Sequence, residues 1–351
     1  MSLKYSWTRV QAFKLPEIRK KYRALWDKIR ADSMRLDQLL AVHRGLWTGA
    51  LYVYIIPREI AEEYRLEIEA LKPTIRGRDI KPFGFIWREF YIIYASAKHM
   101  PDFPKRFPNI MRWLEKHKLI LERRSAVFTW NKEWWELEDP LEPQIFEQKK
   151  ILSPLFSRQQ SFALDISGKY YVLDSTTMIR PWLSDEEREL YAKNWKKVNE
   201  KDLNIDVFIE EGKKASRELG SWGESLWYVL GLLNSETLEF FFKQYSPRLM
   251  KRTKRPKKGR WYSYMPPYLN ILPIRIAEQP TRSEVIRYSR IISEKTNKFL
   301  ALPPDVDPTE KAELESEIGF LVHELNEIIF DIYELNENER IVIQNFVYKK
   351  R

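Results

Sequence analysis

Apolar residues recur at helical spacing over the last third of the chain. They alternate in steps of four and three residues, at Leu314, Ile318, Leu321, Leu325, Ile328, Ile332 and Leu335. Such a heptad seam predicts a helix that packs along a partner helix. Residues 281–300 also show a helical pattern, and prolines between 303 and 308 separate the two stretches. We therefore predict a packed antiparallel helical pair, in preference to a helix that mediates oligomerisation.

The rest of the chain mixes helical patterns with short strand-like runs. Helical spacing predicts a lead-in over 1–35 and helices over 59–71, 108–124, 183–215 and 225–244. Aromatic and β-branched residues predict strands over 51–56, 83–94, 126–129, 150–153, 161–165, 170–173 and 272–274, with a turn at Gly168. The sequence thus predicts a mixed α/β (α+β) fold with short strands and a C-terminal helical pair.

The charge balance indicates the kind of partner that the protein binds. Lys and Arg number 60 against 50 Asp and Glu, so the formal net charge is +10. This surplus favours an acidic partner such as nucleic acid. Cysteine is absent, and the four histidines form no H-x-x-x-H pair, which argues against disulfides, Cys-ligated zinc and other transition-metal sites. Without a signal peptide or a long apolar run, we expect a cytoplasmic protein with no membrane partner.

The basic surplus is concentrated in one segment. Eight cations fall between residues 248 and 260, and they are Arg248, Lys251, Arg252, Lys254, Arg255, Lys257, Lys258 and Arg260. Like charges at this density repel one another, so they predict a mobile, solvated loop. Phosphate would neutralise them and release condensed counterions, so we predict that residues 251–260 hold a DNA backbone. A solubilising loop or a targeting signal is the alternative.

Two catalytic patterns are present but weak. Met265-Pro266-Pro267-Tyr268 resembles the tetrapeptide of amino-methyltransferases, in which Asn or Asp precedes Pro-Pro-aromatic. Methionine offers only a weak thioether acceptor. No glycine-rich turn follows a strand to hold S-adenosylmethionine, so we expect no methyl transfer by this chain alone. Asp139, Glu147 and Lys149 have the spacing of a PD-(D/E)xK nuclease, which would hold Mg²⁺ and activate water. That spacing is common by chance, so a restriction endonuclease remains an alternative, as does an RNA-binding or scaffold protein.

Several segments, in order, resemble one family. They are Leu39-Leu40-Ala41-Val42, Gly45-Leu46-Trp47-Thr48-Gly49, Leu71-Lys72-Pro73-Thr74-Ile75-Arg76-Gly77-Arg78-Asp79-Ile80, Phe107-Pro108-Asn109-Ile110, Leu121-Glu122-Arg123-Arg124, 143–151, Phe162-Ala163-Leu164-Asp165, 230–235, Leu272-Pro273-Ile274 and 328–339. Their order over about residues 36–345 resembles the TaqI-like C-terminal specificity domain of adenine-specific DNA methyltransferases and type IIG restriction-modification enzymes.

The resemblance implies a prokaryotic target-recognition domain that binds double-stranded DNA and recognises base edges through the major groove. It assigns that domain to residues 36–275, between the lead-in 1–35 and the helical pair and tail 276–351. An adenine methyltransferase domain, upstream or in a separate chain, would supply S-adenosylmethionine, and Mg²⁺ if the parent enzyme also cleaves DNA. The chain itself is then expected to hold no catalytic residue, cofactor or metal, and to be either a C-terminal piece or a freestanding subunit.

The candidates for base contacts are polar residues on turns beside the matching segments: Arg76, Arg78, Arg158, Gln159 and Gln160. Arginine is well suited to bidentate contact with guanine, whereas scattered lysines suit phosphate. Glycines at 45, 49 and 77 permit positive φ or a close backbone approach. Two alternatives stay open, namely that Arg78 pairs with Asp79 to brace the turn and that 157–161 is a polar connector.

Overall fold

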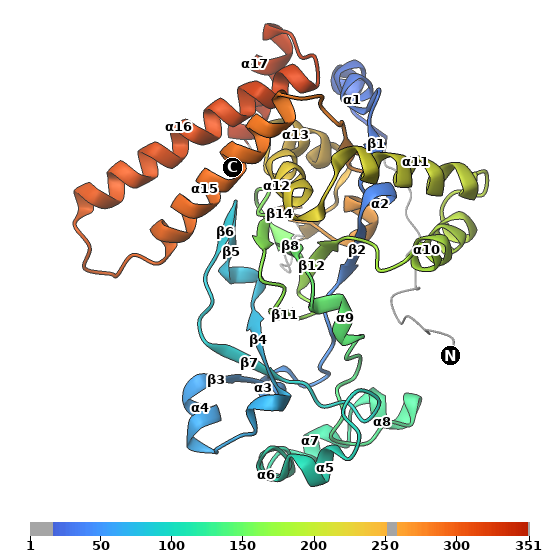
Figure 1. Ribbon diagram of the computed structural model, residues 1–351, viewed down its shortest axis with the longest axis vertical. Helices are drawn as coiled ribbons and strands as arrows, with labels where there is room; N and C mark the ends of the chain where they lie inside the picture. The colour runs from blue at the N-terminus through green and yellow to red at the C-terminus, as the bar shows by residue number, and fades with distance from the viewer. Residues whose placement is uncertain (1–16, 251–257, 350–351) are drawn as a thin grey trace.

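The computed structural model describes residues 17–250 and 258–349. Long helices gather at one end of the molecule, short sheets occupy the middle, and short helices close the other end (Figure 1). This arrangement confirms the predicted mixed α/β fold. Within the described ranges, none of the helices combines the length and the apolar character that crossing a bilayer requires.

Short elements fill the first half of the chain, and long helices dominate the second. The helices are α1 (Arg23–Arg30), α2 (Leu36–Leu39), α3 (Leu51–Tyr54), α4 (Arg58–Glu63), α5 (Phe103–Arg106), α6 (Pro108–Glu115), α7 (Lys118–Leu121), α8 (Ser125–Trp130), α9 (Pro143–Phe146), α10 (Asp185–Val198), α11 (Ile205–Leu219), α12 (Trp222–Leu233), α13 (Glu236–Tyr245), α14 (Pro266–Leu269), α15 (Thr281–Leu300), α16 (Pro308–Ile332) and α17 (Glu337–Tyr348). The strands are β1 (Met34–Arg35), β2 (Ala41–Arg44), β3 (Ile55–Pro57), β4 (Leu71–Ile75), β5 (Ile80–Lys81), β6 (Gly84–Phe85), β7 (Phe90–Ile93), β8 (Lys150–Pro154), β9 (Phe156–Ser157), β10 (Ala163–Asp165), β11 (Tyr171–Val172), β12 (Thr176–Arg180), β13 (Arg248–Met250), β14 (Lys258–Ser263) and β15 (Pro273–Ile274).

The strands form several small sheets. One sheet has the order β10-β8-β12-β2 and is antiparallel throughout. A second has the order β11-β4-β7-β3, in which β4 pairs parallel with β11 and antiparallel with β7. A third, β13-β14-β9, joins a hairpin to the strand that follows β8 in the chain. Residues 77–81 also contact β8, so the chain around residue 78, the chain around 158 and the hairpin lie in one region.

Two large hydrophobic cores lie within the described chain. The first combines α1 and β2 with α12, α13 and the C-terminal helices. In it, Trp26 of α1 stacks on Phe241 of α13, with ring centroids 4.6 Å apart. The second core covers much of the chain between residues 46 and 178, where Phe146 stacks on Tyr171 at 4.4 Å. The N-terminal and C-terminal segments therefore pack together as one body.

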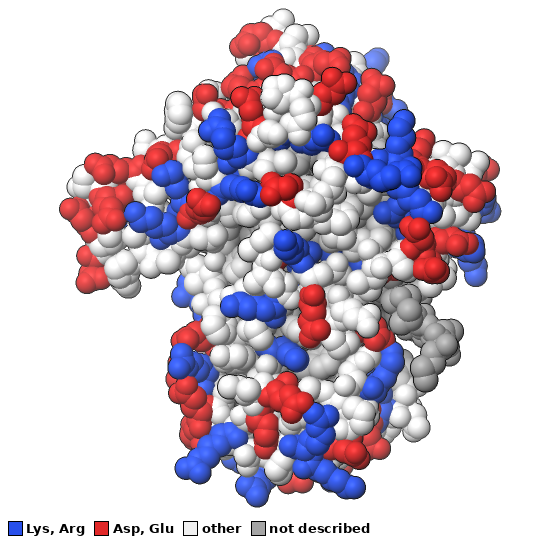
Figure 2. Space-filling view, viewed as in Figure 1, with Lys and Arg blue, Asp and Glu red and all other residues white. Residues whose placement is uncertain are grey.

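The predicted helical pair is confirmed. Helices α15 and α16 lie side by side and are joined by the segment 301–307 (Figure 1). The apolar seam faces inward, since Leu314, Leu325 and Ile332 are buried and the seam residues between them are half-buried. Asp and Glu gather at the far end of this pair, around the joining segment (Figure 2).

Four predictions of local structure need correction. Leu51–Tyr54 is a helical turn, and only the residues after it enter strand β3. Residues 125–130 are helix α8 instead of a strand. The helix predicted over 59–71 ends at Glu63, because the chain then turns into β4. The predicted helix 225–244 is two helices: the Asn234 side chain binds the backbone of Phe162, and Ser235 accepts a hydrogen bond from Leu238 N to begin α13.

Most of the remaining predicted elements are confirmed with small changes of boundary. Residues 1–16 of the predicted lead-in 1–35 lie outside the described residues, and the α-helix in its described part is α1, Arg23–Arg30. Strands β6, β7, β10, β11 and β15 lie within the stretches predicted for them, and β8 runs one residue further, to Pro154. The turn glycine Gly168 has a φ of +68°. Helices α6 and α7 share the stretch 108–124, and α10 and α11 occupy most of 183–215 with a small core of their own.

A buried polar network ties β2 to β12. Arg180 donates from Nε to His43 Nε2 at 3.0 Å, and His43 Nδ1 lies 3.2 Å from the Arg44 carbonyl oxygen. The same guanidinium binds both carboxylate oxygens of Glu187, and neither of these two side chains is exposed. Burial, helped by the charge of Arg180, lowers the pKa of His43 well below 6.5, so the imidazole is neutral.

His43 is expected to make the folded state sensitive to acid. Below pH 6.5 an unfolded histidine binds a proton that folded His43 does not, so the free energy of unfolding falls as the pH drops. The slope contributed is up to about 1.4 kcal/mol per pH unit. Urea unfolding between pH 7.5 and 5.5 measures it. His43→Gln keeps an acceptor for Arg180 but cannot titrate in this range, so its slope should be smaller. Equal slopes in the two proteins contradict the prediction.

Candidate nucleic-acid interface

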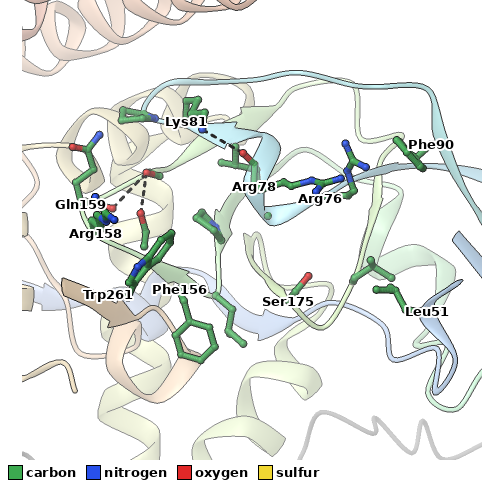
Figure 3. A pocket seen from close by; sticks show the side chains of 18 of the residues that line it. Leu51, Arg76, Arg78, Lys81, Phe90, Phe156, Arg158, Gln159, Ser175 and Trp261 are labelled. Carbon is green, nitrogen blue, oxygen red and sulfur yellow. Dashed lines mark hydrogen bonds between the residues drawn. The ribbon is translucent and has the colours of Figure 1, made fainter. Parts of the chain in front are cut away.

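A groove of about 840 Å³ opens where the segments around residues 52, 78 and 158 meet (Figure 3). Its polar lining includes Arg76, Arg78, Lys81, Arg158, Gln159 and Ser175. We call it the arginine-lined groove. Four of the five base-contact candidates line it, although they come from two distant parts of the sequence. None of the described residues that line it is acidic, so its polar side chains offer mainly hydrogen-bond donors.

The first wall is the single 3-10 turn Gly77–Asp79 between β4 and β5. Ile75 and Ile80 are buried on either side of it and anchor the turn in the second core. Glycine suits this position, because a Cβ at residue 77 would lie 3.0 Å from the Ser175 carbonyl oxygen, which is tighter than an ordinary van der Waals contact. This is the close backbone approach expected of Gly77. Arg78 is exposed at the tip of the turn.

Arg76 and Arg78 have different roles in the turn. Arg76 donates from Nε to Asp79 Oδ2 at 2.7 Å, and its guanidinium lies 3.9 Å from the centre of the Phe90 ring. Its side chain is only 17% exposed. The carboxylate of Asp79 also accepts a hydrogen bond from Arg88. The alternative that Arg78 pairs with Asp79 is therefore wrong: Arg76 braces the turn and leaves the Arg78 guanidinium in solvent.

The second wall is the turn that follows β9. Strand β9 pairs with β14, with Ser157 opposite Tyr262, and the hydroxyls of Ser157 and Ser161 lie 3.4 Å apart across the turn. Arg158 is exposed and lies over the ring of Trp261, 5.5 Å from its centre. Gln159 is half-buried on the lining. The aromatic ring therefore limits the positions that the Arg158 guanidinium can take.

Gln160 does not join the other candidates. It is 3% exposed and does not line the groove. Neither atom of its amide has a hydrogen-bond partner within the described part of the chain. Its side chain is thus positioned beneath the turn instead of at the groove surface.

The basic segment adjoins the second wall. Lys251, Arg252, Lys254, Arg255 and Lys257 lie outside the described residues. The backbones of Lys258 and Arg260 belong to β14, and Arg248 begins β13, so the predicted loop is wrong at both of its ends. The physical reason is pairing, because β13 and β14 form a hairpin that β9 extends. Strand β14 leads directly from the basic segment to Trp261.

Among the groove residues that sequence patterns missed are Lys81, Ser175 and Trp261. Lys81 follows directly after the segment 71–80, and Trp261 follows directly after the basic segment, so both lie next to a sequence pattern that was recognised. Ser175 lies beside no such pattern, because only the folded chain brings it to the groove. On the face shown in Figure 2, charges of both signs cover the two ends, and the middle is mostly uncharged, with Lys and Arg and some Asp or Glu.

The residues with nuclease spacing have other neighbours. Glu147 accepts a hydrogen bond from the Tyr171 hydroxyl at 2.7 Å, and the Lys149 ammonium lies against Gly223 at the start of α12. The backbone of Asp139 pairs with that of Trp47. In the described ranges, no three or more His, Asp or Glu residues are grouped so as to hold a metal ion. The Met265–Tyr268 tetrapeptide leads into α14 and does not line the arginine-lined groove.

Comparisons with known proteins show which sequences and structures the chain resembles. No family model matches the sequence. Over 132 residues the chain is 25% identical to the Type II methyltransferase M.BstVI of Geobacillus stearothermophilus. The matching region covers 36% of this chain and 22% of that protein. The structure resembles that of the Type IIL restriction-modification enzyme MmeI, solved in complex with DNA, with a TM-score of 0.55 and 10% identity over 90% of this chain and 36% of MmeI. The type IIG restriction endonuclease BpuSI gives a TM-score of 0.41 and 10% identity over 89% of this chain and 33% of its own. The chain thus spans about a third of MmeI, and the likeness to MmeI shows a shared fold.

Proposed function

We propose that this chain is the DNA-recognition module of a restriction-modification enzyme and works with an adenine-specific DNA methyltransferase, without catalytic groups of its own. The observation that carries the proposal is the arginine-lined groove, where the exposed Arg78 and Arg158 face one cavity whose described lining holds no carboxylate. The resemblance to M.BstVI and to the fold of MmeI, an enzyme solved with DNA, supports it. S-adenosylmethionine would bind the methyltransferase partner.

The two groups of cations would serve different purposes. Guanine presents two acceptors, O6 and N7, in the major groove, and one arginine can bind both. Arg78 has no side-chain partner among the described residues, so its donors are available for such a contact. Lysines and arginines of the basic segment would hold phosphates, which position the protein on any sequence. The connection through β14 would align the two kinds of contact.

The basic segment is expected to control the salt dependence of DNA binding. Replacing Lys254, Arg255, Lys257 and Lys258 by alanine should weaken binding to all duplexes similarly. The slope of log affinity against log salt concentration should flatten by about 0.9 for each phosphate that the variant no longer neutralises. Fluorescence anisotropy with labelled duplexes between 50 and 200 mM KCl measures both effects.

A charge-matched variant separates a local effect of the segment from an effect of net charge. Alanine at Lys193, Lys197, Lys201 and Lys214, all exposed on or beside α10 and α11, removes the same charge elsewhere and should change the slope little. An unchanged slope in the first variant removes the basic segment from the interface. Failure of the wild-type chain to bind duplex DNA at 50 mM salt overturns the proposed function, and preference for structured RNA favours the RNA-binding alternative.

A further inference from the structure

We infer that Leu51 and Tyr52, at one end of the arginine-lined groove, recognise the 5-methyl group of a thymine in the major groove. The inference rests on the proposed function, because it requires duplex DNA in that groove. It adds an apolar contact of defined chemistry to the hydrogen-bonding contacts proposed for Arg78 and Arg158.

The first observation is exposure. Among the large apolar side chains that the structure describes, Tyr52 is the most exposed, at 91%, and its neighbour Leu51 is 45% exposed. Both line the groove. Single exposed apolar residues are ordinary, but two consecutive ones at the edge of a groove form an apolar surface that binding would cover.

The second observation is that this surface has a rigid support. Leu51 and Tyr52 form the first half of α3, and the second half, Val53 and Tyr54, is buried in the second core. The Tyr54 hydroxyl donates to the Trp135 carbonyl at 3.1 Å, and Trp113 Nε1 donates to the Val53 carbonyl at 2.9 Å. Two residues of α3 therefore hold the fold, while the other two are displayed outside it.

The third observation is the position of the apolar end relative to the donors. In Figure 3, Arg158, Gln159 and Trp261 lie at one end of the groove, Leu51 lies at the other, and Arg78 lies between them. Thymine is the base whose major-groove edge carries a methyl group, beside its O4 acceptor. A surface that offers donors next to apolar side chains complements such an edge, because the donors can bind O4 while the apolar side chains contact the methyl group.

The experiment compares thymine with uracil, which differ only by this methyl group. The full chain first selects its preferred duplexes from a randomised pool. Each thymine of the selected sequence is then replaced by uracil, one at a time, and affinity is measured by fluorescence anisotropy. At one position, uracil should lower the affinity of the wild-type chain about 4-fold, the factor for one buried methyl-sized group.

The protein variants assign that effect to residues. Leu51→Ala/Tyr52→Ala should bind the thymine duplex about 4-fold more weakly and should no longer distinguish uracil. Tyr52→Phe keeps the ring and loses only the hydroxyl, so it should still distinguish thymine from uracil. Phe128→Ala removes a side chain that is 77% exposed on α8, outside the groove, and should leave the uracil effect unchanged. All of these positions are exposed, so the variants should fold, and circular dichroism checks this.

The outcomes separate this inference from the proposed function. If selection enriches no sequence, the proposed function fails. If a sequence is enriched but uracil is tolerated at every position, DNA recognition stands and the methyl contact is overturned. A uracil effect that persists in Leu51→Ala/Tyr52→Ala also overturns it, because another part of the chain then contacts the methyl group.

Discussion

Replacing Arg78 and Arg158 together by alanine is expected to lower affinity for the selected duplex about 100-fold. Each bidentate arginine–guanine contact contributes about 1–3 kcal/mol of discrimination, and the two residues lie on separate turns, so their effects should nearly add. Affinity for unrelated duplexes should fall much less, because the basic segment still binds phosphate. Anisotropy titrations with the selected and a scrambled duplex measure the two affinities and the ratio between them.

Two further variants test whether the effect is specific to the groove. Arg158→Lys keeps the charge but loses the planar pair of donors. It should therefore bind unrelated duplexes about as well as the wild type but should distinguish the selected duplex from the scrambled one less well. Arg112→Ala removes an exposed arginine from α6, outside the groove, and should change neither affinity. If Arg78→Ala/Arg158→Ala weakens binding to both duplexes equally, these arginines contact phosphates instead of bases.

Glu187→Ala is expected to destabilise the fold by about 3–5 kcal/mol, because it leaves the charge of Arg180 buried without its carboxylate. Glu187 also accepts a hydrogen bond from the Leu183 backbone at 2.6 Å, which the variant cannot form. Chemical unfolding followed by circular dichroism measures the change in the free energy of unfolding.

A paired replacement distinguishes the buried charge from simple loss of packing. Arg180→Met/Glu187→Leu removes both charges and should recover much of the stability. Lys193→Ala breaks an exposed pair with Glu189 and should cost under about 1 kcal/mol. If the double variant is as unstable as Glu187→Ala, packing and not the unpaired charge explains the destabilisation.

The accuracy of the sequence predictions depends on whether the determining contacts are local. Thr281–Leu300 was predicted with its observed boundaries, because the amphipathic pattern that specifies this helix lies entirely within the segment. The break after Leu233 was not predictable, since it depends on a hydrogen bond from Asn234 to Phe162 in another part of the chain. Leu51–Tyr54 was mistaken for a strand because a short apolar run fits either structure.

The same distinction applies to the candidate site. Turn positions beside glycine identified Arg76 and Arg78, but only the fold shows that Phe90 and Asp79 bind Arg76 and leave Arg78 exposed. Tyr52 carried no signal at all, because an exposed and a buried tyrosine look alike in a sequence. Exposure and partner choice are properties of the whole fold, so sequence patterns could propose the groove residues without ranking them.

Buried strands support the groove, whereas exposed side chains line it, and this division has an evolutionary consequence. Exchanging Arg78, Arg158 or Tyr52 alters no core packing, so mutations there are nearly neutral for folding. Natural selection can therefore explore new target sequences at these positions while the scaffold stays the same. Homologues with diverged targets should differ most at these three positions and least at their anchors, such as Gly77 and Tyr54.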